Sequence, residues 1–238
     1  MQDAINGWVA SAEAWMDSQG AEGDFSRRWI LDRVMLERVE AQQPRARAAL
    51  DVGCGEGRFC RLLRDRGIPA TGLEPVEPLR ARAEALDPTG RYCAGQAEAL
   101  PFDDGSFDLL VSYLTLIDID GVEEALAEMV RVLRPGGQLL IANINPFCSA
   151  GGWVKDAEGR SLHFAADRYL EIRAEWQEWA GIRIVNWHRP MEAYMQPLLR
   201  AGLRLTHFSE PAPHGGPAER VEKYTRLPWF HVMEWRKD

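Results

Sequence analysis

Three glycines lie close together in residues 50–57, LDVGCGEG, directly after an apolar stretch and directly before an amphipathic one. A turn from strand to helix that carries Gly53, Gly55 and Gly57 lets backbone N–H groups and the helix N-terminus approach a ligand closely. The spacing differs from the G-x-G-x-x-G of dinucleotide-binding proteins. The Lys-Ser/Thr ending of a triphosphate-binding loop is also missing. The loop therefore predicts a ligand that touches the backbone without a pyrophosphate or a triphosphate.

Two carboxylates accompany this loop. Asp51 comes just before it, and Glu74 closes the next predicted strand in GLEP, 17 residues after Gly57. A carboxylate one helix and one strand beyond the loop can accept hydrogen bonds from the two hydroxyls of a ribose. Such a bond contributes roughly 1.5–3 kcal/mol. An acidic residue at the end of a strand can also cap a turn or a helix, so both interpretations stay open for Glu74.

Strand and helix patterns alternate between residues 48 and 137 and place the glycine loop after the first strand. The predicted strands cover residues 49–52, 70–73, 91–94, 107–113 and 138–144. The predicted helices cover residues 57–66, 78–86 and 122–133. A helix over 190–201 and strands over 203–208 and 229–235 complete the pattern. The alternation predicts an α/β fold with a Rossmann-like, mostly parallel seven-stranded sheet and helices on both faces.

Two aromatic-rich segments lie outside this alternation. Residues 1–44 predict an N-terminal helical cap or lid, with one face formed by Ile5, Trp8, Val9, Ala12, Trp15 and Met16. Residues 145–188 predict an insertion after the fifth strand that covers the acceptor side. Within it, 175–179 and 182–188 read as an antiparallel hairpin, although a helix over 167–179 also fits. The aromatic side chains either add to the core or face a ligand.

Composition and charge exclude several classes of protein. The chain has 238 residues, of which 46% are hydrophobic and 27% charged, and its formal charge is −8. This balance predicts a globular protein and argues against a nucleic-acid partner. No apolar run approaches the roughly 18 residues of a membrane span, and the N-terminus does not resemble a secretory signal. The four cysteines show no paired metal spacing, which predicts reduced thiols in a cytoplasmic protein without a metal site.

Four motifs occur in a recognisable order: LDVGCGEG, GLEP, AGQAEALPFDDGSFDLLVS and RVLRPGGQLLIA. In this order they resemble the class I S-adenosylmethionine-dependent methyltransferases, within them the small-molecule group called type 11. The resemblance is strong over residues 48–145 and looser over the final helix and strands. It implies that residues 45–238 form the methyltransferase domain. It also implies S-adenosylmethionine as cofactor and S-adenosylhomocysteine as product.

The resemblance implies roles for the loop and for the end of the fourth strand. Gly53, Cys54 and Gly55 would lie beside the methionine moiety, and Asp51 would bond its ammonium group directly or through water. Tyr113 and Leu114 would border the reactive methyl group. A ligand that offers an amino-acid end to the loop needs no phosphate.

Further positions would hold the adenosine. The resemblance implies that Glu74 binds the ribose hydroxyls and that Pro75 flanks the adenine. Gln96 stands where the family usually has Asp, and its amide oxygen can still accept from the adenine amine without a charge. The Ala97 backbone N–H would serve a ring nitrogen.

Candidates for the chemistry lie near the predicted insertion. His188 and Asp118 are candidate proton acceptors, which are needed only for an acceptor that must lose a proton. For both residues a cap or a satisfied hydrogen bond is the competing interpretation. The aromatic and histidine candidates for binding the acceptor are Trp8, Trp29, Phe147, Trp153 and His163.

Together these features predict an enzyme, a monomer or homodimer, that transfers a methyl group in line to a small aromatic or partly apolar acceptor. The partner is therefore a small molecule, with neither nucleic acid nor membrane involved. A noncatalytic sensor or scaffold that binds S-adenosylmethionine is the alternative, and Gln96 supports it slightly. The same fold could also serve other chemistry with a modified cofactor.

Overall fold

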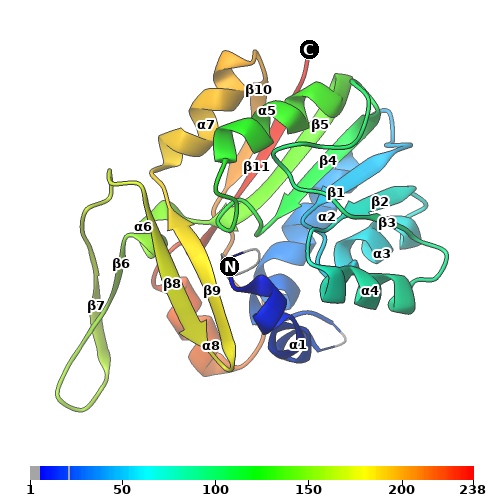
Figure 1. Ribbon diagram of the computed structural model, residues 1–238. Helices are drawn as coiled ribbons and strands as arrows, with labels where there is room; N and C mark the ends of the chain where they lie inside the picture. Colours follow the sequence, from blue (N-terminus) through cyan, green and yellow to red (C-terminus); the bar gives the residue numbers. More distant parts are fainter. Residues whose placement is uncertain (1–5, 21) are drawn as a thin grey trace.

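A seven-stranded sheet forms the centre of the computed structural model, which describes residues 6–20 and 22–238 (Figure 1). Its strands lie in the order β10 (Arg204–Ser209), β11 (Phe230–Arg236), β5 (Leu133–Ile144), β4 (Phe107–Tyr113), β1 (Ala49–Val52), β2 (Ala70–Leu73) and β3 (Arg91–Cys93). The strands from β1 to β5 pair in parallel, whereas β11 is antiparallel to both β5 and β10. The predicted Rossmann-like, mostly parallel sheet is confirmed.

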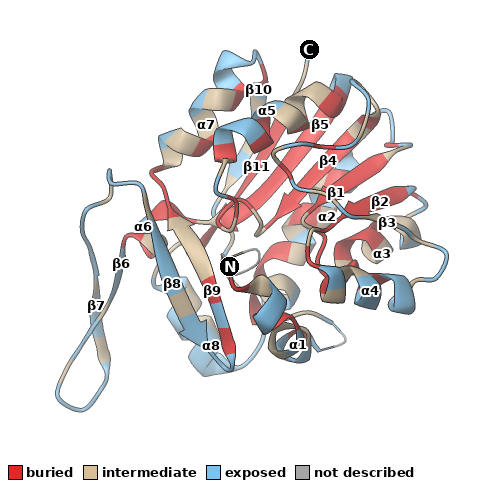
Figure 2. Ribbon diagram, in the orientation of Figure 1, coloured by how far each residue is buried: buried red, intermediate tan, exposed pale blue. Residues whose placement is uncertain are grey.

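Helices cover both faces of this sheet (Figure 1). Alternate strand residues point to opposite faces and divide the core into two clusters. One cluster includes residues of α5 (Val122–Val132) and α7 (Met191–Arg200), and the other includes residues of α2 (Asp32–Ala41) and α3 (Arg58–Asp65). Figure 2 shows the central strands buried along most of their length, as expected for a sheet covered on both sides.

The fifth strand begins earlier than predicted. The helix α5 ends at Val132, and Leu133 already pairs with Phe107 of β4. Gly136 takes a left-handed φ of 76° inside the RPGG stretch, which lets the chain turn and continue as strand. Leu133 is fully buried, so packing against the sheet draws it into β5.

Residues 145–188 form two hairpins beside the sheet. In the second, β8 (Arg173–Trp179) pairs with β9 (Ile182–His188), as predicted, which excludes the alternative helix over 167–179. The first, β6 (Gly151–Lys155) with β7 (Ser161–Ala166), was not predicted, because its strands are mostly exposed and show weak alternation (Figure 2). Two short helices were not predicted either: α6 (Pro146–Ser149) and α8 (Ala218–Thr225).

The N-terminal helix α1 (Trp8–Gln19) lies against β9 and against α4 (Glu77–Leu86). The Ser11 hydroxyl accepts a hydrogen bond from the Arg183 N–H at 2.9 Å and donates to the Arg183 carbonyl at 3.0 Å. The Val185 N–H donates to the carbonyl of Asn6 at 2.9 Å. The Ser11 side chain therefore attaches α1 to the insertion, and Asn6 just before the helix adds a backbone contact. Ile5, predicted on the same helical face, lies outside the described residues.

The rest of the predicted N-terminal cap packs differently. A π-helical turn η1 (Arg27–Leu31) continues into α2, and both enter the core on one face of the sheet. Leu31 and Met35 are fully buried there. Thus α1 covers the carboxyl edge of the sheet. In contrast, η1 and α2 belong to the helical layer on one face of the sheet.

Several predicted properties can be compared directly with the described residues. Among residues 6–20 and 22–238, no helix is both long and apolar enough to cross a membrane. In the same part of the chain, His, Cys, Asp and Glu side chains form no group of three or more that could hold a metal ion. All four cysteines are free thiols, and three of them are buried.

Candidate functional site

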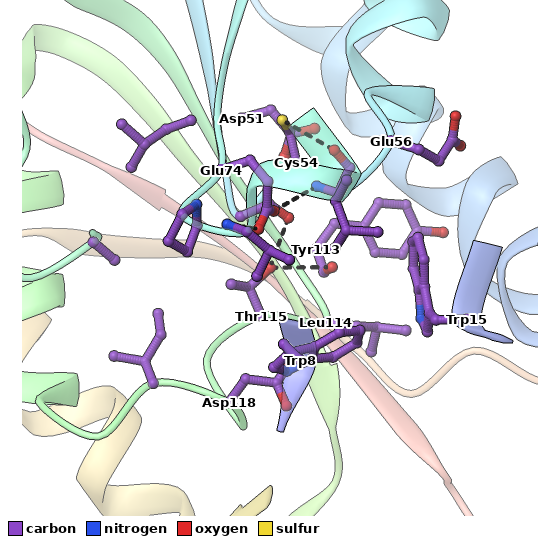
Figure 3. Close-up of a pocket in the computed structure, with 18 of the residues that line it drawn as sticks. Trp8, Trp15, Asp51, Cys54, Glu56, Glu74, Tyr113, Leu114, Thr115 and Asp118 are labelled. Carbon is purple, nitrogen blue, oxygen red and sulfur yellow. Dashed lines mark hydrogen bonds between the residues drawn. The ribbon is translucent and has the colours of Figure 1, made fainter. Parts of the chain in front are cut away.

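A cavity of about 560 Å³ opens at the carboxyl ends of β1, β2 and β4 (Figure 3). Ligands of open α/β sheets bind at this edge. The wall of this cavity contains all ten positions predicted to bind the cofactor: Asp51, Gly53, Cys54, Gly55, Glu74, Pro75, Gln96, Ala97, Tyr113 and Leu114. The structure therefore brings together residues that are spread over more than 60 positions of the chain. Their individual roles remain predictions.

The glycine loop closes one end of the cavity. Gly53 and Cys54 both donate their N–H groups to the Leu73 carbonyl, at 2.8 and 3.0 Å, which ties the loop to β2. Gly53 has a φ of 73°, and a Cβ atom there would lie 2.2 Å from Cγ2 of Thr115. A Cβ atom on Gly55 would lie 3.0 Å from the ring of Trp15. Both positions need glycine because the backbone is left-handed and neighbouring side chains pack directly on it.

Glu74 faces the loop, as its predicted role requires. Its Oε2 accepts a hydrogen bond from the Gly55 N–H at 2.8 Å, and its Oε1 accepts one from the Val76 N–H at 2.9 Å. Burial raises the pKa of Glu74, and these two backbone bonds oppose that shift. Each carboxylate oxygen keeps further accepting capacity, so ribose hydroxyls and the loop can share the carboxylate.

Asp51 has a buried oxygen that lacks a partner. Oδ2 accepts from the Cys60 thiol at 3.6 Å, whereas Oδ1 has no hydrogen-bond partner among the described residues. Burial raises the pKa of Asp51 to about 7, and the negative charge of Glu74 adds to the effect. Buried polar atoms almost always find partners. A cationic donor in the cavity would give Oδ1 of Asp51 the hydrogen-bond partner that it lacks. The site therefore fits the ammonium group of S-adenosylmethionine.

Part of the cavity wall suits a flat apolar ring. The apolar residues Pro75, Val76, Leu79, Ala97 and Ile119 all line the cavity. These side chains offer hydrocarbon surface for an adenine. A short turn in which the Ala99 N–H donates to the Gln96 carbonyl at 3.2 Å brings Gln96 to the same region, where its amide stays exposed.

The end of β4 turns sharply beneath the loop. Leu114 has a φ of 58°, an uncommon value for a residue with a side chain. Its N–H donates to the Ala142 carbonyl at 2.8 Å, which holds the strained residue in place. The Tyr113 hydroxyl donates to Asp32 at 2.9 Å and therefore does not project into the cavity as a free donor. Strain of this kind gathers at functional sites.

Asp118 and Trp8 both line the cavity (Figure 3). Oδ1 of Asp118 accepts a hydrogen bond from the Asn186 side chain at 2.5 Å. Burial raises the pKa of Asp118 well above its usual range, and the bond from Asn186 opposes the shift. Asp118 remains a candidate proton acceptor.

His188 does not reach the cavity, which corrects its candidacy as a base. Only 2% of the residue is exposed. Its Nε2 lies 2.8 Å from the carbonyl of Tyr169, and its Nδ1 lies 2.7 Å from the hydroxyl of Ser149. A carbonyl only accepts, so Nε2 carries the proton and Nδ1 faces the serine. Both ring nitrogens are satisfied by the insertion itself, and burial lowers the pKa of His188.

The structure also leaves four predicted acceptor-binding residues outside the cavity wall. Trp29 packs against His214, with ring centroids 5.7 Å apart. Phe147 stacks on Tyr169, and Trp153 meets Phe164 edge to face within the first hairpin. His163 is exposed on β7. Phe147 and Trp153 thus make their ring contacts within the insertion, whereas Trp29 packs outside it.

Several lining residues were missed by sequence reasoning: Asn6, Trp15, Arg27, Glu56, Arg58 and Thr115. Trp15 shares the apolar face of Trp8 at a spacing of seven residues, so that face was the available signal. The two arginines carried no local signal. They reach the cavity only because α1, η1 and α3 converge there.

A buried arginine holds the loop that carries Asp118. Arg189 is 2% exposed, and its guanidinium donates to the carbonyls of Leu116, Ile119 and Asp120 at 3.2, 2.6 and 2.8 Å. The neighbouring Trp187 N–H donates to the carbonyl of Ile117 at 2.6 Å. The NWHR stretch, residues 186–189 just before α7, therefore fixes the conformation of the loop after β4.

We expect Arg189→Met to destabilise the protein by about 2–3 kcal/mol, because three carbonyls lose a charged donor. Urea unfolding followed by circular dichroism measures the change. Arg200→Met is the matched control, since its ion pair with Glu123 is exposed and contributes about 0–1 kcal/mol. Equal unfolding midpoints for the two variants would contradict the role of Arg189.

Comparison with known proteins places this geometry in a family. Residues 50–141 match the profile of a family described as a methyltransferase domain. Over 153 residues the chain is 37% identical to a malonyl-[acyl-carrier protein] O-methyltransferase of Erwinia billingiae, covering 64% of this chain and 53% of that protein. Over 120 residues it is 32% identical to a demethylmenaquinone methyltransferase of Renibacterium salmoninarum, covering 50% and 49%. The chain spans about half the length of these curated relatives.

A solved structure agrees over most of the chain. The S-adenosylmethionine dependent methyltransferase of Mesorhizobium loti superimposes with a TM-score of 0.75 and 27% identity, covering 86% of this chain and 96% of that one. The matched family domain contains the glycine loop, Glu74 and the end of β4. These findings support a class I S-adenosylmethionine-dependent methyltransferase of type 11, with the family match confined to residues 50–141.

Proposed function

We propose that this protein transfers the methyl group of S-adenosylmethionine to a small, aromatic or partly apolar acceptor bound beneath α1. The observation that carries the proposal is the pair of carboxylates around the glycine loop. Asp51 presents an unpartnered buried oxygen, and Glu74 faces the loop backbone. One matches a cationic amino-acid end, and the other matches a ribose.

Bound S-adenosylmethionine supplies an electrophilic methyl group on a sulfonium, so the protein has mainly to bind, align and exclude water. Holding two reactants in line can contribute roughly 7–11 kcal/mol to lowering the barrier. Trp8 and Trp15, whose rings meet edge to face at 5.8 Å, cover the cavity from α1. Aromatic faces near a cation add about 0.5–2 kcal/mol.

The wall of the cavity supports a small acceptor. Trp8, Trp15 and Leu114 supply apolar surface, while Asp118 supplies a polar group to the same cavity. The names of the curated relatives point to an acyl-carrier-protein substrate in one case and a quinone precursor in the other. Relatives with such different acceptors support the shared methyl donor and leave the acceptor to be derived from this cavity.

Two experiments test the proposal. Calorimetry measures binding of S-adenosylmethionine and S-adenosylhomocysteine to the purified protein. A second assay measures transfer of a radiolabelled methyl group to a panel of phenols, amines and thiols. Lack of binding by the folded protein would refute it. Binding without transfer to any member of the panel would favour the noncatalytic sensor or scaffold.

We expect Glu74→Ala to weaken binding of S-adenosylhomocysteine by about 10- to 100-fold, because the N–H groups of Gly55 and Val76 lose their acceptor together with the ribose contact. Glu77→Ala, an exposed position in the first turn of α4, serves as the control and should retain wild-type affinity. Calorimetry on both variants decides the matter. If Glu74→Ala binds as tightly as Glu77→Ala, the proposed role of Glu74 is wrong.

A further inference from the structure

Carboxylates dominate the charged groups of the cavity wall: Asp51, Glu56, Glu74, Glu98, Asp118 and Asp120. The wall also contains two arginines, each already paired with a carboxylate. Arg27 lies 2.9 Å from Asp24, and Arg58 forms an ion pair with Asp32. Among the described lining residues there is no lysine. A negatively charged acceptor would therefore meet a wall without an unpaired cation.

The carboxylates serve two separate ends of the cavity. Asp51, with its unpartnered buried oxygen, and Glu74 lie at the glycine loop, where the cofactor is proposed to bind. Asp118 lies away from the loop, beside Trp8 (Figure 3). It is half-buried, and Asn186 from the insertion orients it through the 2.5 Å hydrogen bond to Oδ1. This carboxylate is thus left for the acceptor.

Resting on the proposed methyl transfer, we propose that the acceptor is an amine held by Asp118 beside Trp8 and Trp15, and that free carboxylates are excluded. An amine or ammonium donates N–H groups, which the carboxylate of Asp118 accepts with charge assistance. The indole rings offer surface that favours a cation. A carboxylate acceptor would bring a further negative charge to a wall that holds six carboxyl groups and no unpaired cation among its described residues, which is costly.

The same geometry accounts for the proton and the electrons. Asp118 takes the N–H proton of an ammonium acceptor, which frees the nitrogen lone pair. That lone pair forms the new N–C bond as the C–S bond breaks, and the electron pair of the broken bond stays on sulfur. The products are the methylated ammonium and S-adenosylhomocysteine, so no oxidant or reductant is needed. Burial raises the pKa of Asp118, and an ammonium group beside it favours the ionised carboxylate that takes the proton.

The inference is tested by measuring how tightly three probes of similar size bind to the full chain. The protein is first saturated with S-adenosylhomocysteine. The probes are 2-phenylethylamine, 3-phenylpropanoate and 3-phenylpropan-1-ol, measured by calorimetry and by tryptophan fluorescence. We expect the amine to bind about tenfold or more tightly than the other two. Asp118→Asn should weaken amine binding about tenfold and change binding of the alcohol less than about twofold. Asp103→Asn, an exposed site outside this cavity, is the matched control.

The outcomes separate this inference from the proposed function. If 3-phenylpropanoate binds as tightly as the amine, or if the amine does not bind at all, the inference is wrong although methyl transfer to another acceptor stands. The wild-type ratio decides this even where Asp118→Asn fails to fold. A folded wild-type protein that does not bind S-adenosylhomocysteine would instead remove the proposed function.

Discussion

Gly53→Ala should lower the affinity for S-adenosylhomocysteine by about 10- to 100-fold, because the loop that carries the ligand contacts must move. The new Cβ would lie 2.2 Å from Cγ2 of Thr115, a branched side chain that has little room to rotate away. The backbone there has a φ of 73°, which adds strain of about 1–2 kcal/mol for a residue with a side chain. Calorimetry and thermal unfolding report affinity and stability separately.

Gly67→Ala distinguishes the clash from the strain. Gly67 has a nearly identical φ of 72°, but nothing lies within 4 Å of a Cβ placed there. This control should lose only the strain energy and keep its cofactor affinity. Adding Thr115→Ala to Gly53→Ala removes Cγ2 and should restore part of the affinity. If Gly53→Ala and Gly67→Ala bind equally well, the packing of the loop on Thr115 does not matter for binding.

Asp51 should make cofactor binding depend on pH, with proton release below about pH 7. Burial raises the pKa of this carboxyl to about 7, so much of it is protonated in the protein without ligand at pH 6. An ammonium group beside Oδ1 favours the carboxylate and expels the proton. Affinity should therefore rise between pH 6 and 8. Calorimetry in buffers of different ionisation enthalpy measures the protons released.

Asp51→Asn should abolish this proton release and weaken binding by about 10- to 100-fold, since the amide cannot supply the charge. The same shift has a consequence for stability. The folded state holds the proton more tightly than the unfolded state, so the contribution of Asp51 to stability falls as pH rises from about 4 to about 7. Asp51→Asn should flatten that fall. Wild-type binding without proton uptake or release at pH 6 would contradict the role of Asp51.

The central sheet and the cofactor end of the cavity could be predicted from the sequence. The strands 49–52, 70–73 and 107–113 occur with the predicted bounds. Apolar runs, glycines and turn residues within a few positions specify each strand–loop–helix unit. Parallel pairing with right-handed crossovers then brings the strand ends to one edge. For this reason Asp51, Glu74 and Tyr113 were predicted to converge on one edge, and they line one cavity.

The end of the cavity that is proposed to hold the acceptor was decided by tertiary structure alone. Trp8 and Trp29 both lie in the aromatic-rich segment 1–44, yet of the two only Trp8 lines the cavity. The reason is that α1 is held against β9 by the hydrogen bonds between Ser11 and Arg183. His188 is drawn into hydrogen bonds within the insertion, whereas Asn186, two residues earlier, reaches Asp118. Such contacts join positions up to 172 residues apart. Local patterns do not encode which side chain faces which across that separation, since packing between distant segments selects it.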